Sequence, residues 1–302
     1  MLEVRNLHKT FGETRALESL DFTIQSGEIM GLIGQNGSGK TTTFRLILNL
    51  LQQDQGEVLW KGNPLTKLDF NAIGYLPEER GLYPKMTIEE QIIYFSELRG
   101  RRASVVKSEI GQWMEKFNVK GKKTNLVKTL SKGNQQKVQL ICTLIHKPKL
   151  IILDEPFSGL DPVNADLLIK GVFEARNDGA SVIFSSHNMN NVEELCDKLI
   201  MLREGRQILN GSVRDIRLKS GRTRLTIEGS DLLLSDFHKI PGVISTTEDH
   251  YHVKHLILKN DQVGKEVFDL VTRNAGGYVP VFNQQPPTLD EIFKEKVGEK
   301  YA

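Results

Sequence analysis

The chain has 302 residues, of which 39% are hydrophobic and 26% are charged, the ordinary balance of a globular protein. Its 40 Lys and Arg nearly equal its 38 Asp and Glu, so the net charge of +2 gives no reason to expect a nucleic-acid partner. No stretch approaches the roughly 18–20 apolar residues that a membrane-spanning helix needs. The two cysteines, Cys142 and Cys196, lie in apolar surroundings that are typical of reduced thiols in a cytosolic protein.

The first 212 residues have the pattern of an α/β domain. Short apolar segments alternate with amphipathic helices, which predicts a mainly parallel sheet covered by helices. The segments Ile29–Ile33, Leu150–Leu153 and Ser181–Ser185 suit central strands, because each is brief, apolar and followed by polar residues. Helix-forming residues dominate from about residue 82 to 140, which indicates a helical insertion between two strands.

Residues 213–302 have the pattern of a smaller α+β domain. Strands are expected at Arg224–Glu228, Gly242–Thr247, His252–Lys259 and Gly277–Phe282. Helices are expected at Asp231–His238 and Asp261–Asn274, and a last one from about Thr288. The order βαββαβ is that of a ferredoxin-like domain.

A phosphate-binding loop follows the first predicted central strand. It fits the pattern G-x-x-x-x-G-K-[ST], and its residues are Gly34, Gln35, Asn36, Gly37, Ser38, Gly39, Lys40 and Thr41. The strand Ile29–Ile33 enters the loop and a helix, Thr42–Leu51, is expected to leave it, which argues against a chance glycine-rich turn. Backbone N–H groups and the helix dipole attract phosphate there. Lys40 can reach the β- and γ-phosphates of ATP and the Thr41 hydroxyl can ligate Mg²⁺.

Two adjacent acids end the strand Leu150–Leu153. Asp154 is the candidate for holding Mg²⁺ and Glu155 for orienting and deprotonating an attacking water. The alternative is an acid pair that caps the next helix. A phosphate-binding loop alone does not separate kinases, GTPases, helicases and transporters.

With these motifs, residues 1–212 resemble the ATPases of ABC transporters. The segment LSKGN at Leu130–Asn134 resembles the signature loop of that family, Ser158–Asp161 resembles its D-loop, and His187 its switch histidine. Phe11 falls where the family places an aromatic residue. A lone histidine or an aromatic residue near a strand is more often structural, and only the order of the motifs favours a functional role for these two.

The resemblance implies a set of site residues. Phe11 would stack on adenine, and the phosphate-binding loop with Thr42 would hold the nucleotide. His187 would hydrogen-bond the γ-phosphate and hold the attacking water. The signature-loop region would contact ATP held by a second ATPase subunit, through Ser131, Gly133 and Gln135.

Two positions depart from the family pattern. Glu78 stands where the family has a glutamine that ligates Mg²⁺, and a carboxylate can still serve as a ligand. Within the signature loop, Lys132 replaces a glycine and Asn134 a glutamine, whereas Ser131 and Gly133 are kept. We therefore expect an active, Mg²⁺-dependent ATPase.

The resemblance also implies partners. Two such subunits, expected to be copies of this chain, would close on two ATP molecules and drive a separate membrane-spanning permease from the cytoplasmic face of the membrane. The phrases IGYLPEERGLYPKMT and PTLDEIFKEKVGEKY resemble bacterial exporters of the sodium-efflux and drug-efflux type. The alternative is a soluble ABC ATPase that acts on nucleic acid or ribosomes; those usually carry two ATPase domains or coiled-coil insertions, and this sequence has neither.

Overall fold

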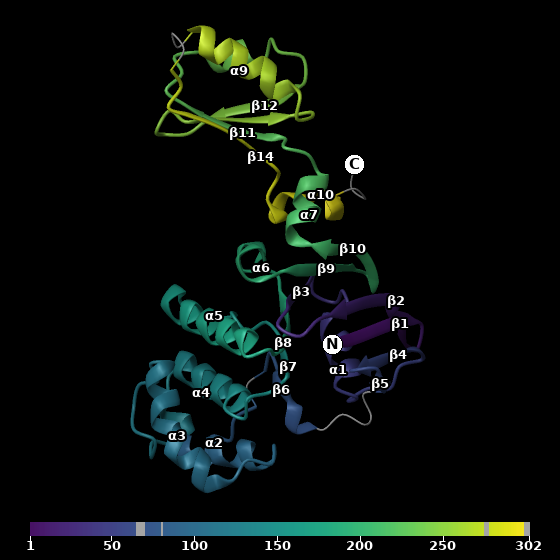
Figure 1. Cartoon of the computed structure of the whole chain (residues 1–302), viewed down its shortest axis with the longest axis vertical. Coiled ribbons are helices and arrows are strands. Elements are labelled where there is room, and N and C mark those ends of the chain that lie inside the picture. The colour runs from purple at the N-terminus through teal and green to yellow at the C-terminus, as the bar shows by residue number, and fades with distance from the viewer. Residues whose placement is uncertain (65–69, 80, 275–277, 299–302) are drawn as a thin grey trace. The chain divides into compact units, whose positions relative to one another are not determined.

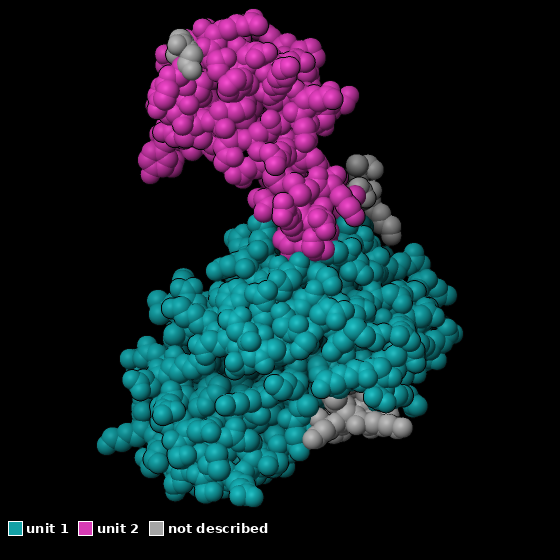
Figure 2. Space-filling view, in the orientation of Figure 1, with its two compact units in different colours: residues 1–211 teal, residues 212–302 magenta. Residues whose placement is uncertain are grey.

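The computed structural model describes residues 1–64, 70–79, 81–274 and 278–298. The chain forms two compact units, Met1–Gly211 and Ser212–Ala302, which Figure 2 colours teal and magenta. Each unit has its own hydrophobic core. The first core includes Leu32, Phe44 and Ile183, and the second is built around Phe237 and Val267.

Unit 1 contains a ten-stranded sheet in the order β5-β4-β1-β2-β10-β9-β3-β8-β7-β6. The strands β3, β6, β7, β8 and β9 form its parallel part (Figure 1). Their bounds are Ile29–Gly34, Ile73–Leu76, Leu150–Leu153, Ser181–Ser186 and Lys198–Arg203. The central strands β3, β7 and β8 are buried along their whole length, as aliphatic runs covered on both faces should be. The predicted central strands are therefore confirmed.

The rest of this sheet includes antiparallel strands that the sequence reading did not place. β1 pairs with both β2 and β4, and β4 pairs with β5. The bounds of these strands are Leu2–Phe11, Thr14–Ile24, Gln55–Trp60 and Asn63–Pro64. β10, Arg206–Ser212, adds one parallel bridge to β2. The sheet is thus mixed, with its parallel part next to the phosphate-binding loop.

Each helix of unit 1 comes after a strand of the parallel part of the sheet along the chain. Their bounds are Lys40–Ile47 for α1, Ile88–Glu97 for α2, Ala103–Lys116 for α3, Lys132–Leu144 for α4, Pro162–Asn177 for α5 and Met189–Leu195 for α6. In the sequence, α2, α3 and α4 fall between β6 and β7, which confirms the helical insertion. α2 begins with a capping box between Thr87 and Glu90, and α5 begins at Pro162 after the N-cap Asp161. α1 starts two residues before the predicted Thr42 and ends at Ile47 instead of Leu51.

Unit 2 contains a four-stranded sheet in the order β12-β13-β11-β14, with antiparallel neighbours. This order is that of a ferredoxin-like domain, as predicted. The strands are Arg224–Glu228 for β11, Val243–Glu248 for β12, Lys254–Leu258 for β13 and Val281–Gln285 for β14. The helices are Val213–Lys219 for α7, Leu234–Phe237 for α8, Val263–Asn274 for α9 and Leu289–Gly298 for α10.

Several details of unit 2 differ from the prediction, and the helix expected at Asp231–His238 is shortened to Leu234–Phe237. α7 was not expected. β13 starts later than His252 because that residue, at φ +62°, lies in the turn after β12. β14 starts at Val281, and Gly277, where it was expected to start, lies outside the described residues. Within the described part of the chain, no helix is long and apolar enough to cross a membrane.

Candidate functional site

The phosphate-binding loop joins β3 to α1 in a backbone path that its glycines permit. Gly37 and Gly39 have φ of +81° and +107°, in the region that favours glycine. A Cβ at Gly39 would lie 2.6 Å from the Ala16 carbonyl oxygen, so only glycine fits the start of α1. The backbone N–H of Ser38 donates to the Gln35 oxygen at 3.1 Å, which closes the loop. This geometry is a phosphate cradle at a helix N-terminus.

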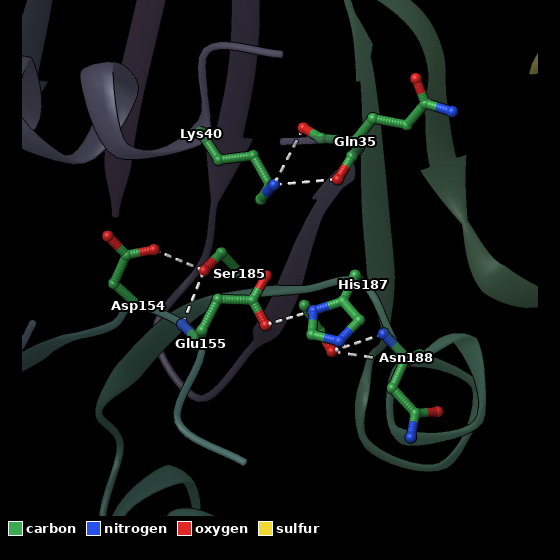
Figure 3. Close-up of polar contacts among 9 residues, drawn as sticks. Gln35, Lys40, Asp154, Glu155, Ser185, His187 and Asn188 are labelled. Atoms are coloured by element: carbon green, nitrogen blue, oxygen red, sulfur yellow. Dashed lines mark hydrogen bonds and ion pairs between the residues drawn. The ribbon is translucent and has the colours of Figure 1, made fainter. Parts of the chain in front are cut away.

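Lys40 lies inside this loop. Its side chain is buried, and Nζ donates to the carbonyl oxygens of Gly34 at 2.9 Å and Gln35 at 3.2 Å (Figure 3). Carbonyl oxygens are neutral acceptors, and an ammonium bonds more strongly to anionic ones. The lysine is therefore held where a phosphate group could replace its present acceptors.

A cavity of about 540 Å³ opens in front of the loop. It brings together the predicted base Glu155 and most of the predicted nucleotide and metal residues, namely Asn36, Gly37, Gly39, Lys40, Thr41, Thr42, Glu78 and Asp154. Its wall also contains residues that the sequence reading missed, namely Thr14, Arg15, Ala16 and Glu204. Such a volume suits a nucleotide-sized ligand. The missed residues come from β2 and from the turn before β10, whose adjacency to the loop depends on sheet topology and leaves no local signal in the sequence.

Asp154 and Glu155 follow β7 at the edge of this cavity. Asp154 is buried, and its Oδ2 accepts a hydrogen bond from the Thr41 hydroxyl at 3.1 Å. Its Oδ1 accepts one from the Ser185 hydroxyl at 2.6 Å, and the Ser185 Oγ in turn accepts the Glu155 backbone N–H at 2.8 Å (Figure 3). The sequence reading placed Ser185 in a strand and gave it no role. The one feature of the sequence that could have indicated a role for Ser185 is that it is a polar residue near the end of an apolar strand.

Glu155 and His187 lie side by side although 32 positions separate them. Nδ1 of the His187 ring lies 2.9 Å from Oε2 of Glu155, and both residues line a second cavity next to the first. The imidazole is 70% exposed, whereas the Glu155 carboxylate is 10% exposed, and its Oε1 is buried without a partner among the described residues. A buried carboxylate oxygen with spare acceptor capacity is suited to take a hydrogen bond from a water or ligand.

The residues around Thr41 fit a magnesium ion that arrives with a nucleotide. The Thr41 hydroxyl and the Asp154 and Glu78 carboxylates border the same cavity and offer only oxygen ligands. Within the described ranges, no group of three or more His, Cys, Asp or Glu could hold a metal by itself. Mg²⁺ is commonly held by one or two carboxylates together with the phosphates of a substrate.

Phe11 lies beside the cavity and not in its wall. The ring is 47% exposed, with Lys9 Nζ 5.4 Å from its centroid, and Phe11 pairs with Thr14, which does line the cavity. Gly34, Gln35 and Ser38 belong to the loop but do not border the cavity. Gly34 and Gln35 instead supply the carbonyl groups that hold Lys40.

The predicted signature residues lie at the start of α4 and do not join this cavity. Ser131 is the N-cap of α4, and its hydroxyl accepts the Asn134 N–H at 3.3 Å. Gly133 has space around it, since a Cβ at this position would lie 3.7 Å from its nearest neighbour, on Asn164. The Gln135 amide donates to the Leu130 carbonyl at 3.1 Å, within its own loop. One copy of the chain therefore does not bring these residues to its own phosphate-binding loop.

Comparison with known proteins identifies the family. Residues 17–158 match the family model described as ABC transporter, and residues 211–297 match the model of the C-terminal domain of DrrA1-3-like ATP-binding proteins. YhaQ of Bacillus subtilis, described as an uncharacterized ABC transporter ATP-binding protein, is 43% identical over 302 residues, which cover 100% of both chains. The chain is a member of the ABC transporter ATP-binding proteins.

Other ABC proteins agree with this assignment. LnrL of Bacillus subtilis, a linearmycin resistance ATP-binding protein, is 30% identical over 307 aligned positions, which cover 99% of this chain and 98% of LnrL. A solved structure described as the ATP-binding subunit of an ABC transporter superposes with a TM-score of 0.68 at 30% identity. The superposition covers 72% of this chain and 92% of that one. The chain thus has the ABC ATPase fold, binds ATP and is an ATPase of this family.

Proposed function

We propose that this ABC ATPase powers export through a separate membrane-spanning subunit, by closing as a pair of copies on two ATP molecules and hydrolysing them. The observation that carries the proposal is the convergence of Lys40, Asp154 and Glu155 on one cavity in front of a phosphate-binding loop. These residues come from α1 and from the end of β7, more than a hundred positions apart in the sequence. Phosphoryl transfer to water needs three groups at one phosphate site: a cation, a carboxylate that binds a metal ion, and a carboxylate that acts as a base.

The proposed roles follow from the contacts. The backbone of Gly34–Thr42 and the Lys40 ammonium bind the phosphates, and Phe11 covers the adenine from beside the cavity. Thr41, Asp154 and Glu78 hold Mg²⁺, which neutralises charge on the phosphates when it is bound. Glu155 orients and deprotonates the attacking water, because one of its carboxylate oxygens has spare acceptor capacity.

His187 is proposed to position both Glu155 and the γ-phosphate. One ring nitrogen already lies within hydrogen-bond distance of Glu155, and the ring is mostly exposed, so its other nitrogen can reach a ligand. A histidine with one nitrogen on a carboxylate has its ring orientation set by that contact. The pair therefore links the proposed base to the phosphate that reacts.

A second copy of the chain is proposed to complete each site. Ser131 and Gly133 stand at the N-terminus of a 13-residue helix, which offers N–H groups and positive potential to an anion. They lie outside the cavity of their own chain, so the nucleotide that they would contact is one held by another subunit. The resemblance to ABC ATPases supports a contact of these two residues with the γ-phosphate that the other subunit holds. Gln135, whose amide bonds to its own loop, supports this helix start from within.

Export, and not import or ribosome assembly, is proposed on two grounds. The relative named for linearmycin resistance aligns along nearly the whole chain, including unit 2. Unit 2 also matches the C-terminal domain of DrrA1-3-like proteins. The chain would work at the cytoplasmic face of the membrane, against the permease that forms the transport path, with sodium or a drug as the exported substrate.

Glu155→Gln is the test of the proposed chemistry. The amide keeps the size of the side chain and a donor–acceptor pair for His187 but removes the base, so ATP binding should persist while turnover falls roughly 10²–10⁴-fold. Size-exclusion chromatography with ATP and Mg²⁺ should then show accumulated dimers. Turnover equal to that of the unmodified chain would remove Glu155 from the role of base.

Copurification from membranes tests the partner. Recovery of a polytopic membrane protein with the tagged full-length chain supports transport, and recovery of ribosomes supports the alternative of a soluble assembly factor. Uptake and efflux assays in vesicles that contain both subunits would then decide the direction.

A further inference from the structure

The hydroxyl of Ser185 touches both acids at the end of β7. Oγ lies 2.6 Å from Oδ1 of Asp154 and 2.8 Å from the backbone nitrogen of Glu155 (Figure 3). Ser185 is fully buried in β8, the strand next to β7 in the sheet. A hydroxyl has one proton and two lone pairs. Because the backbone N–H must donate, the hydroxyl proton goes to Asp154 and a lone pair accepts the Glu155 N–H.

We propose that Ser185 is a positioning residue for ATP hydrolysis, which holds the Asp154 carboxylate and the Glu155 backbone in one fixed arrangement. The inference rests on the roles proposed above for those two acids. Ser185 does not border the nucleotide cavity, so it acts only through its neighbours.

On the Asp154 side, the serine sets which oxygen faces the ligand. With Oδ1 held by Ser185, Oδ2 is left at 3.1 Å from the Thr41 hydroxyl, the second proposed magnesium ligand. A carboxylate bonded at both oxygens cannot rotate about its last torsion without losing one bond. Groups that hold a metal-binding carboxylate in this way typically contribute roughly 10–100-fold in metal affinity or activity.

On the Glu155 side, the serine supports an unfavourable backbone conformation. Glu155 has φ +47°, which non-glycine residues adopt rarely and which persists only where the surroundings impose it. Its N–H is held by Ser185, its carbonyl oxygen accepts the Ser158 N–H at 3.1 Å, and its carboxylate meets His187. Without the serine oxygen, the peptide between the two acids loses its acceptor and can relax, which would turn the Glu155 side chain away from its position.

The test compares Ser185→Ala with Ser181→Ala in the full-length chain. Ser181 is a matched control: it is also buried in β8, but at the opposite end, where its hydroxyl donates to the Gln25 carbonyl at 2.9 Å. The first readout is the Mg²⁺ concentration that gives half of the thermal stabilisation by a non-hydrolysable ATP analogue. The second readout is whether each substitution changes the kcat or the KM of ATP hydrolysis.

For Ser185→Ala, the Mg²⁺ midpoint should rise about tenfold or more and kcat should fall by a similar factor. Binding of the analogue in EDTA and the KM at saturating Mg²⁺ should stay near those of the unmodified chain, because Ser185 touches the proposed metal ligand and base but no residue proposed to bind the phosphates or the adenine. Ser181→Ala should change the unfolding temperature alone. If Ser185→Ala does not fold, Ser185→Cys decides, because a thiol keeps the shape but is a weak donor.

The inference is overturned if the serine variant that folds matches Ser181→Ala in both readouts. That failure differs from failure of the proposed function. If Asp154→Asn and Glu155→Gln abolish turnover while Ser185→Ala does not alter it, only the role of Ser185 is refuted. If Asp154→Asn and Glu155→Gln leave turnover unchanged, the proposed chemistry falls and the role of Ser185 falls with it.

Discussion

Replacement of Lys40 by methionine tests whether the cavity in front of the phosphate-binding loop is the nucleotide site. In the present structure, Lys40 donates to two neutral carbonyl oxygens, at 2.9 and 3.2 Å. Bound ATP would replace them by anionic phosphate oxygens. A hydrogen bond between charged groups contributes roughly 1.5–3 kcal/mol and one to a neutral acceptor about 1 kcal/mol. Two exchanged bonds therefore favour ATP by ~1–4 kcal/mol, with a central value of about 2.5 kcal/mol.

The expected result is a loss of ATP·Mg²⁺ affinity of roughly 60-fold, within a range of about 5- to 700-fold, since about 1.4 kcal/mol corresponds to a factor of ten. The free protein should change little in stability, because the variant also removes a buried ammonium that has only neutral acceptors, and burial of such a charge is itself unfavourable. Isothermal titration calorimetry measures the affinity, and thermal unfolding without nucleotide measures the stability.

Lys254→Met is the matched control. Lys254 is also buried and also donates to a backbone carbonyl, that of Ser230 at 2.6 Å, but it lies in unit 2. It should leave ATP affinity unaltered. The energetic argument requires Lys40→Met to lose at least ~1 kcal/mol of ATP binding free energy. An ATP affinity within about threefold of that of the unmodified chain would therefore refute it. An equal loss in Lys254→Met would mean that the effect is general destabilisation.

Two further predictions concern Phe11 and His146. Phe11→Ala should weaken ATP binding by about 1 kcal/mol or more, the usual scale for stacking of a base on an aromatic ring, and should leave binding of inorganic triphosphate unchanged; titration with both ligands checks this. Burial lowers the pKa of His146 below its ordinary value, against the opposing effect of its hydrogen bond to the Ile73 carbonyl. The unfolded chain therefore takes up a proton first, and stability should fall as the pH drops below about 6.5. His146→Gln should lose less stability between about pH 7.5 and 5.5 than the unmodified chain in thermal unfolding, and an equal loss would contradict the assignment.

The local pattern of apolar and polar residues was enough to predict those helices and strands whose first and last residues are determined by the sequence of the element itself. Leu150–Leu153 and Arg224–Glu228 have the same bounds in the structure as in the prediction, because apolar or alternating residues meet polar ones at both ends. α1 was placed too late because Gly39, and not Thr42, is the residue at which the backbone turns into the helix. α7 is only seven residues long, and β13 is shortened by a turn, so neither has a periodic pattern that fixes its limits.

Contacts across the sheet were beyond a sequence reading. The motifs indicated that Asp154, Glu155 and His187 belong to one site, but not that β7 and β8 are neighbours. That pairing places Ser185 between the two acids and His187 beside Glu155. Likewise, Arg15 and Glu204 reach the cavity only because β2 and β10 are adjacent in the sheet. The roles of all these residues stay predictions until the variants are measured.

The arrangement of the motifs also bears on why one copy of the chain would not be sufficient. Lys40, Thr41 and Asp154 converge because they follow strands in the parallel part of one mixed sheet, and the carboxyl ends of those strands share an edge. Ser131 and Gly133 start α4, which belongs to the helical insertion between β6 and β7, and they do not reach that edge. Hydrolysis would then require another copy to supply its α4 N-terminus. Under the proposed function, the two ATP sites would be coupled, because the nucleotide in each site would hold together the interface that the other site needs.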